Sequence, residues 1–162
     1  MELTQDQKVY DTLNKLQIQY KKHEHPAVFT MEDVNKLDLN LPECKNLFVR
    51  NTKGNKHYLV ILEGSKKADL KKLATQIGST KLSFASKERL FKYLMLLPGS
   101  VSPFGLINDK DKQVEVIVDK DLVNSDELGF HPNTNEATVT LSFSDFEKYL
   151  KSCGNKFSYI KI

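Results

Sequence analysis

The sequence has no tryptophan and only two cysteines, Cys44 and Cys153, among its 162 residues. Two isolated cysteines provide neither the ligand spacing of a zinc site nor the density of a disulfide scaffold, and they are typical of a reduced compartment. A chain of this length that is 40% hydrophobic can bury a core without such cross-links. We therefore expect a single domain over residues 1–162, located in the cytoplasm.

Long hydrophobic runs are also missing. The longest apolar stretches are short, such as YLVIL at 58–62, whereas a membrane-spanning helix needs about 20 apolar residues. The N-terminal segment, MELTQDQKVYDTL, lacks the apolar region of a secretory signal. The sequence therefore predicts no interaction with a membrane.

A strong excess of one charge sign is absent, since the formal net charge is only +3. That value alone does not indicate nucleic-acid binding. The positive residues are nevertheless concentrated between positions 66 and 92, and they are Lys66, Lys67, Lys71, Lys72, Lys81, Lys87, Arg89 and Lys92. Two interpretations remain open, a pair of solvated helix faces or a patch that contacts a polyanion backbone.

Helix and strand patterns alternate along the chain. Helices are predicted over 5–17 after the N-cap Thr4, from the N-cap Thr30, over 66–77 before Gly78, from the N-cap Ser86, and from Ser144 to about Gly154. Strands are predicted over 18–22, 45–51, 56–64, 82–85, 105–107, 114–119, 137–143 and 157–162.

The connections between these elements are too irregular for a doubly wound parallel sheet. The runs 45–51 and 56–64 flank a glycine turn and indicate a hairpin. The second run is apolar at consecutive positions, which is typical of a central strand covered on both faces. The fold class that we predict is α/β (α+β) with a largely antiparallel or mixed sheet.

Common catalytic motifs are absent, including glycine-rich nucleotide loops, H-E-x-x-H and G-x-S-x-G. His23 and His25 could share a face of a strand, but no third ligand is evident, so no metal site is expected. Three features remain: Lys45 at the start of a strand, the loop from Gly99 to Pro103, and His131. Each alone has an ordinary structural explanation, as an exposed lysine, a turn and a loop histidine.

Taken together, these features resemble a known family. CKNLF at 44–48, GSVSPFGLIND at 99–109 and GFHPNTNEATVTLS at 129–142 occur in the order and spacing of the free-standing YbaK/ProX-type editing proteins, and HEHPAVFTMEDV at 23–34 is similar to their N-terminal signature. The resemblance covers about residues 5–155 and is greatest to the branch that hydrolyses alanyl-tRNA(Pro). It implies a mixed, partly barrel-like sheet surrounded by helices, with no metal and no other cofactor.

The resemblance also implies roles for individual residues. Lys45, Gly99 and His131 are the expected catalytic residues, with the Lys45 ammonium and loop N–H groups stabilising the oxyanion that forms during ester hydrolysis. The expected substrate-binding residues are Phe29, Thr30, Asn46, Ser100, Val101, Ser102 and Pro103. Weaker contacts to tRNA are expected from Lys66, Lys67, Lys71 and Lys72. The implied partners are tRNA(Pro) charged with alanine and, as a candidate, prolyl-tRNA synthetase.

Three alternatives remain open at this point. The aminoacyl group could be cysteine or another small residue, or the chain could be a non-catalytic module that binds tRNA or a synthetase. A cysteine hydrolase using Cys44 and His131 is the third, but alternation along a strand would place Cys44 and Lys45 on opposite faces.

Overall fold

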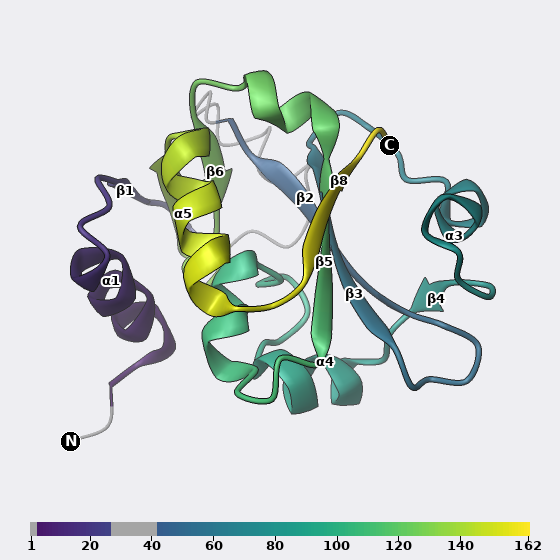
Figure 1. Ribbon diagram of the computed structural model, residues 1–162. Helices are drawn as coiled ribbons and strands as arrows, with labels where there is room; N and C mark the ends of the chain where they lie inside the picture. Colours follow the sequence, from purple (N-terminus) through teal and green to yellow (C-terminus); the bar gives the residue numbers. More distant parts are fainter. Residues whose placement is uncertain (1–2, 27–41) are drawn as a thin grey trace.

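The computed structural model describes residues 3–26 and 42–162 (Figure 1). The predicted helix from Thr30 and the expected pocket residues Phe29 and Thr30 lie outside these residues. The helices are α1 (Gln5–Lys15), α3 (Leu70–Ile77), α4 (Lys87–Leu94) and α5 (Phe143–Cys153), and the 3-10 helices are η1 (Pro103–Asn108) and η2 (Lys120–Asn124). The strands are β1 (Lys21–Glu24), β2 (Cys44–Arg50), β3 (His57–Glu63), β4 (Ser83–Phe84), β5 (Val114–Asp119), β6 (Leu128–Phe130), β7 (Ala137–Leu141) and β8 (Phe157–Ile160).

The described strands form two sheets. One has the order β1-β7-β6 and is antiparallel, while the other has the order β4-β2-β3-β5-β8. In the second sheet β2 is antiparallel to its neighbours, whereas β3, β5 and β8 run parallel. The mixed α/β class predicted from the sequence is therefore confirmed. In residues 3–26 and 42–162 one parallel bridge, between Glu43 and Gly129, links the two sheets, so closure into a barrel is not confirmed.

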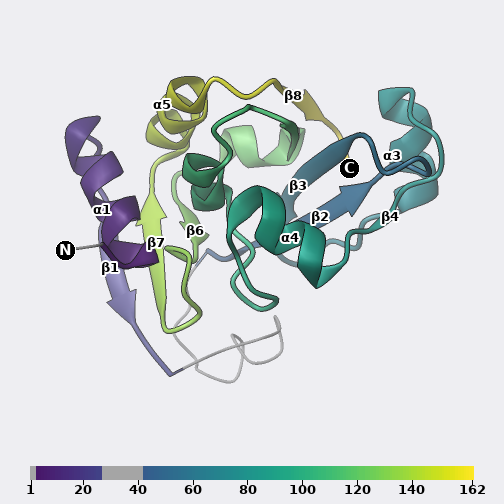
Figure 2. The ribbon, with the colours of Figure 1, turned by 90° about the horizontal axis from the view of Figure 1, so that it is seen from below.

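The five-stranded sheet separates two hydrophobic cores. The larger core lies between this sheet, the three-stranded sheet and the helices α1, α4, α5 and η1. The smaller core lies on the opposite face, under α3 (Figure 1). Strand β3 contributes Leu59 and Ile61 to the first core and Val60 and Leu62 to the second. This confirms that the apolar run at 56–64 is a central strand covered on both faces. Figure 2 shows α1 beside the three-stranded sheet.

Most helix ends follow the local signals in the sequence. Thr4 and Ser86 cap α1 and α4, accepting from the N–H groups of Gln7 and Arg89. Gly78 ends α3 in the left-handed conformation, as predicted. The start of α3 was predicted too early, because Asp69, and not a residue near Lys66, caps this helix.

Two further predictions differ from the structure. Residues 105–107 form part of the 3-10 helix η1 and no strand, because the Ser102 hydroxyl caps the N–H of Phe104 and Pro103 has no N–H to offer a ladder. The strand predicted at 18–22 begins only at Lys21, since α1 ends in a turn with Gln17 at φ 59° and the Ile18 N–H bonds to Leu13. Strand β6 and the 3-10 helix η2 had not been predicted.

Candidate functional site

The face of β2 that carries Lys45 follows from the packing of its neighbours. Cys44 and Phe48 belong to the larger core, whereas Leu47 and Val49 pack against the smaller one. Because side chains alternate along a strand, Lys45 and the preceding Glu43 face away from the larger core. Asn46 lies on the opposite face from Lys45, where its Nδ2 donates to the Cys44 carbonyl over 3.3 Å.

The three-stranded sheet presents a polar face on the same side. Leu128 and Phe130 of β6 lie in the larger core, which leaves Gly129 and His131 on the other face. Gly129 is bridged in parallel to Glu43. Lys45 lies two residues after Glu43, and His131 lies two residues after Gly129. The backbone register of this parallel bridge therefore places Lys45 and His131 on one face.

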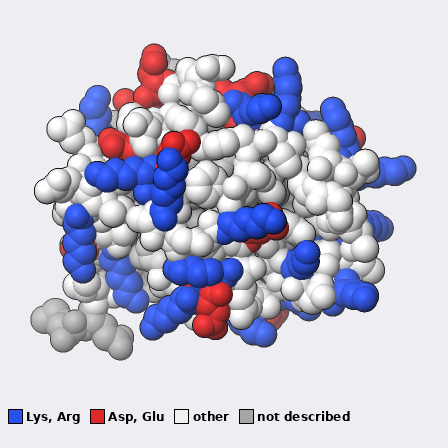
Figure 3. All heavy atoms as spheres, in the orientation of Figure 1, with Lys and Arg blue, Asp and Glu red and all other residues white. Residues whose placement is uncertain are grey.

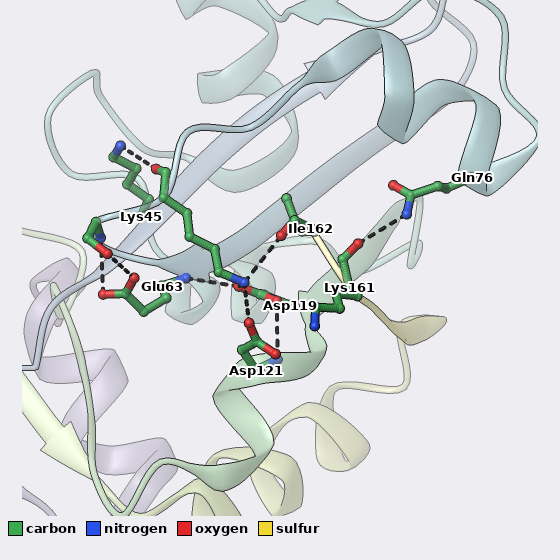
Figure 4. A network of polar contacts seen from close by, with 9 residues as sticks. Lys45, Glu63, Gln76, Asp119, Asp121, Lys161 and Ile162 are labelled. Carbon is green, nitrogen blue, oxygen red and sulfur yellow. Dashed lines mark hydrogen bonds and ion pairs between the residues drawn. The ribbon is translucent and has the colours of Figure 1, made fainter.

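The Lys45 amine itself contacts the turn after β3. Its Nζ donates to the Lys66 carbonyl over 2.6 Å, and Lys45 is partly buried. The Lys66 side chain in turn lies 2.8 Å from Asp119 and 2.6 Å from Asp121, and it donates to the Ile162 carbonyl (Figure 4). The amine is therefore held at a sheet edge by a fixed backbone carbonyl, and no hydrogen bond among the described residues joins it to His131.

His131 directly follows β6, and its ring is oriented by one hydrogen bond. The His131 Nδ1 lies 3.0 Å from the Ala137 carbonyl, which can only accept, so Nδ1 carries the proton. His131 Nε2 has no hydrogen-bond partner within the part of the chain that the structure describes. Sequence reasoning assigned His131 to a site, and the structure gives it a defined tautomer.

Glu43 and Thr138, two neighbouring side chains, were missed by sequence reasoning, which had considered His25 only as a partner of His23. His25 Nε2 lies 2.8 Å from the Thr138 hydroxyl, and that hydroxyl donates to the Glu43 carboxylate. The rings of His25 and His131 are 6.2 Å apart. Alternation along CKNLF could have indicated Glu43, because it precedes Lys45 by two residues on a strand.

The donor set His25, Glu43 and His131 is of a kind that binds metals. One ligand atom from each lies within 4.8 Å of the others. Both ring nitrogens of His25, however, already have oxygen partners, in Thr138 and the Pro26 carbonyl. Hydrogen bonding accounts for this arrangement without an ion.

The loop from Gly99 to Pro103 lies beside the segment that carries His131. The Phe104 ring packs edge-on against Phe130 at 6.0 Å, and Asn133 donates to the Phe104 carbonyl. The Pro103 carbonyl accepts from the Tyr149 hydroxyl over 2.8 Å, which fixes the end of the loop. The Ser100 N–H donates to the Leu97 carbonyl, so a ligand could accept only from other N–H groups of the loop.

The four lysines expected to contact tRNA differ in their surroundings. Lys67, Lys71 and Lys72 are exposed on or beside α3, at the edge where blue side chains project in Figure 3. Lys66 is held in the ion pairs described above, which offset its charge. Lys67, Lys71 and Lys72 therefore keep an exposed charge, whereas the charge of Lys66 is offset by Asp119 and Asp121.

Comparison with known proteins identifies the family. Residues 25–149 match the model of the aminoacyl-tRNA editing domain. The chain belongs to this family. It is 48% identical, over the full length of both chains, to the prolyl-tRNA editing protein ProX of Acetoanaerobium sticklandii. It is 32% identical to the prolyl-tRNA synthetase associated domain-containing protein 1 of Bos taurus, over 88% of this chain and 86% of the relative.

A solved structure supports the fold. A candidate trans-editing enzyme for prolyl-tRNA synthetase superposes with a TM-score of 0.71 over 100% of this chain and 99% of that one, at 18% identity. Membership of the editing family confirms the activity class predicted from the sequence, which is hydrolysis of the ester bond of an aminoacyl-tRNA. No helix in the described part of the chain is both long and apolar enough to cross a bilayer.

The cysteine alternative is tested by one substitution in this editing domain. Cys44 is 7% exposed, and burial raises the pKa of its thiol, so the thiolate that a nucleophile requires is disfavoured. We expect Cys44→Ala to keep deacylation within about twofold of wild type, because the thiol faces the core. A large loss of turnover in folded Cys44→Ala protein, measured with purified substrate, would restore the cysteine mechanism.

Proposed function

We propose that this chain is a free-standing deacylase that hydrolyses alanine mistakenly attached to tRNA(Pro). The observation that carries the proposal is the shared face of Lys45 and His131, set by the Glu43–Gly129 bridge, in a chain of the editing family. The 48% identical relative named as a prolyl-tRNA editing protein supports proline tRNA as the carrier. We place the activity in the cytoplasm, with prolyl-tRNA synthetase as a candidate partner.

Lys45 would act on the ester carbonyl. An ammonium group has three N–H donors, and the Lys66 carbonyl occupies one of them. The other two have no partner among the described residues and would be available to the carbonyl oxygen, which becomes negatively charged in the tetrahedral intermediate. N–H groups of Gly99, Val101 and Ser102 would supply further donors, with Ser100 and Pro103 shaping the loop.

The remaining site residues would bind the substrate. The Nε2 of His131, which has no partner among the described residues, is suited to accept a hydrogen bond from a hydroxyl of the terminal ribose. Phe29 and Thr30 stay assigned to the aminoacyl pocket. Asn46 lies on the opposite face of β2 from Lys45, so it would support the strand and would not contact the aminoacyl group. Lys67, Lys71 and Lys72 would contact backbone phosphates by salt-sensitive interactions, and Lys66 would contribute through the turn that it holds.

Selectivity follows from size. A synthetase pocket built for proline cannot exclude the smaller alanine, because each missing methylene changes binding by only about 1–3 kcal/mol. A second pocket that admits alanine and excludes proline completes the discrimination.

The test is a deacylation panel with tRNA(Pro) carrying alanine, cysteine, serine or proline. We expect alanine to be released fastest and proline to be retained, measured as loss of radiolabelled aminoacyl-tRNA with time. Faster release of cysteine would favour the cysteinyl-tRNA(Pro) alternative. Binding of all four substrates without turnover would identify a non-catalytic module.

A further inference from the structure

Lys45 belongs to a row of side chains that crosses three neighbouring strands. Lys45 of β2 pairs with Leu62 of β3, and cross-strand partners share a face of the sheet. Asp119 ends β5 and shares a face with Ile117, which packs with Leu62 in the smaller core. The β3–β5 ladder ends one residue before Leu62 and one residue before Asp119, so these two residues are neighbours. Lys45 and Asp119 therefore lie on one face of the sheet, about 10 Å apart at the backbone, with Leu62 between them.

Lys66 connects the two ends of this row (Figure 4). Its backbone carbonyl accepts from the Lys45 Nζ at 2.6 Å, and its own Nζ lies 2.8 Å from the Asp119 carboxylate. The same amine donates to Asp121 at 2.6 Å and to the Ile162 carbonyl at 3.2 Å. Three acceptors match the three N–H donors of an ammonium group. The Lys66 side chain is therefore held from three directions.

Asp119 is the buried member of this connection. Its side chain is 0% exposed, and its described partners are the Lys66 ammonium, the Glu63 N–H at 3.4 Å and the Asp121 N–H at 3.2 Å. All three partners are donors, so a protonated carboxyl would have no acceptor for its proton among the described residues. Asp119 is thus the fixed negative charge that holds Lys66, whereas the Asp121 side chain is 47% exposed and water competes for its contact.

The turn itself gives the Lys66 carbonyl one direction. The Lys66 N–H donates to the Glu63 carbonyl over 3.1 Å, and the Ser65 N–H donates to the Glu63 carboxylate over 3.1 Å. The turn is therefore fixed at its start by β3 and at Lys66 by Asp119. A lysine amine on its flexible stem is poorly oriented without such a partner. Moving a reacting group by about 1 Å can lower a rate about a hundredfold, so the anchor of Lys45 matters for catalysis.

We propose that Asp119 is a positioning residue of the reaction, which acts through the side chain and carbonyl of Lys66 to hold the Lys45 ammonium at the edge of the sheet. This inference rests on the proposed deacylase function and on Lys45 as the donor to the oxyanion. Asp119 itself does not contact the substrate, because its side chain is completely buried.

The first test is Asp119→Asn, which keeps the size of the side chain and removes its charge. We expect kcat for alanyl-tRNA(Pro) to fall about tenfold, with KM within about threefold of wild type, because the amine is displaced and binding is not lost. Asp111→Asn is the matched control with wild-type kinetics, because Asp111 is exposed in the turn before the same strand.

The second test asks whether the loss passes through Lys45. In a Lys45→Ala background, Asp119→Asn should change the single-turnover rate by less than about threefold, because the amine that it positions is gone. A residue that only supports the overall structure would lower the rate by the same factor in both backgrounds.

The third test separates positioning from stability. The double variant Lys66→Met with Asp119→Asn removes both charges, so its urea midpoint should recover part of what Lys66→Met loses. Its kcat should nevertheless stay about tenfold below wild type, because the turn is no longer held. This variant decides the question if Asp119→Asn does not fold.

An NMR measurement reports the anchor without any substrate. The Lys45 ammonium protons should exchange slowly with water in isotope-labelled wild type, and this slow exchange should be lost in Asp119→Asn. The signal is assigned by its absence from Lys45→Ala.

Four outcomes would overturn the inference. They are a folded Asp119→Asn protein with kcat within about threefold of wild type, an equal loss in the two Lys45 backgrounds, a kcat that recovers together with stability in the double variant, and unchanged exchange of the Lys45 ammonium protons. Failure of the proposed function is recognised separately, because then wild type itself releases no amino acid from any substrate of the panel.

Discussion

Replacing Lys45 with alanine is expected to lower the deacylation rate by about 100- to 1,000-fold, which is the usual effect of removing one donor from an oxyanion site. The ammonium lies at the edge of the sheet, where the Lys66 carbonyl holds it at 2.6 Å. Its other two N–H donors have no partner in residues 3–26 and 42–162. Because the charge develops on the carbonyl oxygen only in the transition state, the loss should appear mainly in kcat.

Single-turnover deacylation of alanyl-tRNA(Pro) by Lys45→Ala and wild type measures this effect directly. Lys53→Ala is the matched control, since Lys53 is exposed in the turn of the same hairpin. The variant should retain its fold, because Lys45 is only partly buried and has no ion pair among the described residues. Turnover at the wild-type rate in soluble Lys45→Ala protein would remove this lysine from the mechanism.

The parts of the fold that were predictable from the sequence depend on short-range patterns. Thr4, Ser86 and Gly78 mark helix ends because capping involves residues only three or four positions away. The apolar run of β3 was recognisable because both faces of a central strand are buried. In contrast, η1 was misread as a strand, because its conformation also depends on close packing of Gly105 against Leu96, which no short-range pattern reveals.

The candidate site was only partly predictable for the same reason. The motifs located Lys45 and His131, but their common face depends on the bridge between Glu43 and Gly129, which are far apart in sequence. Lys66 is a second case in which a side-chain pairing was not predictable. Its place in a lysine-rich run suggested a phosphate contact, and the position of Asp119 at the end of β5, which pairs with its amine, could not be read from that run.

Replacing Lys66 with methionine is expected to lower the free energy of unfolding by about 3 kcal/mol, at the lower end of the range for breaking a buried ion pair. Asp119 is completely buried, with its Oδ2 at 2.8 Å from the Lys66 amine, so the variant leaves a carboxylate without its counter-charge. The lower end applies because the Lys66 side chain is 24% exposed. Hydrogen bonds from Lys66 lower the pKa of Asp121, which keeps this second partner ionised at neutral pH.

Urea unfolding measures the free energy of unfolding of Lys66→Met and of the control Lys120→Met. Lys120 is an exposed lysine that lies between Asp119 and Asp121 in the sequence. Adding Asp119→Asn to Lys66→Met should recover part of the loss, because the uncompensated charge is then gone. A loss below about 1 kcal/mol would place the pair with ordinary surface salt bridges.

The same variant separates the two roles of Lys66. If the lysine mainly contacts tRNA, KM should rise and become less sensitive to salt, with stability unchanged. If it mainly holds the turn, stability should fall and kcat should fall with it, because the carbonyl that positions Lys45 belongs to Lys66 itself.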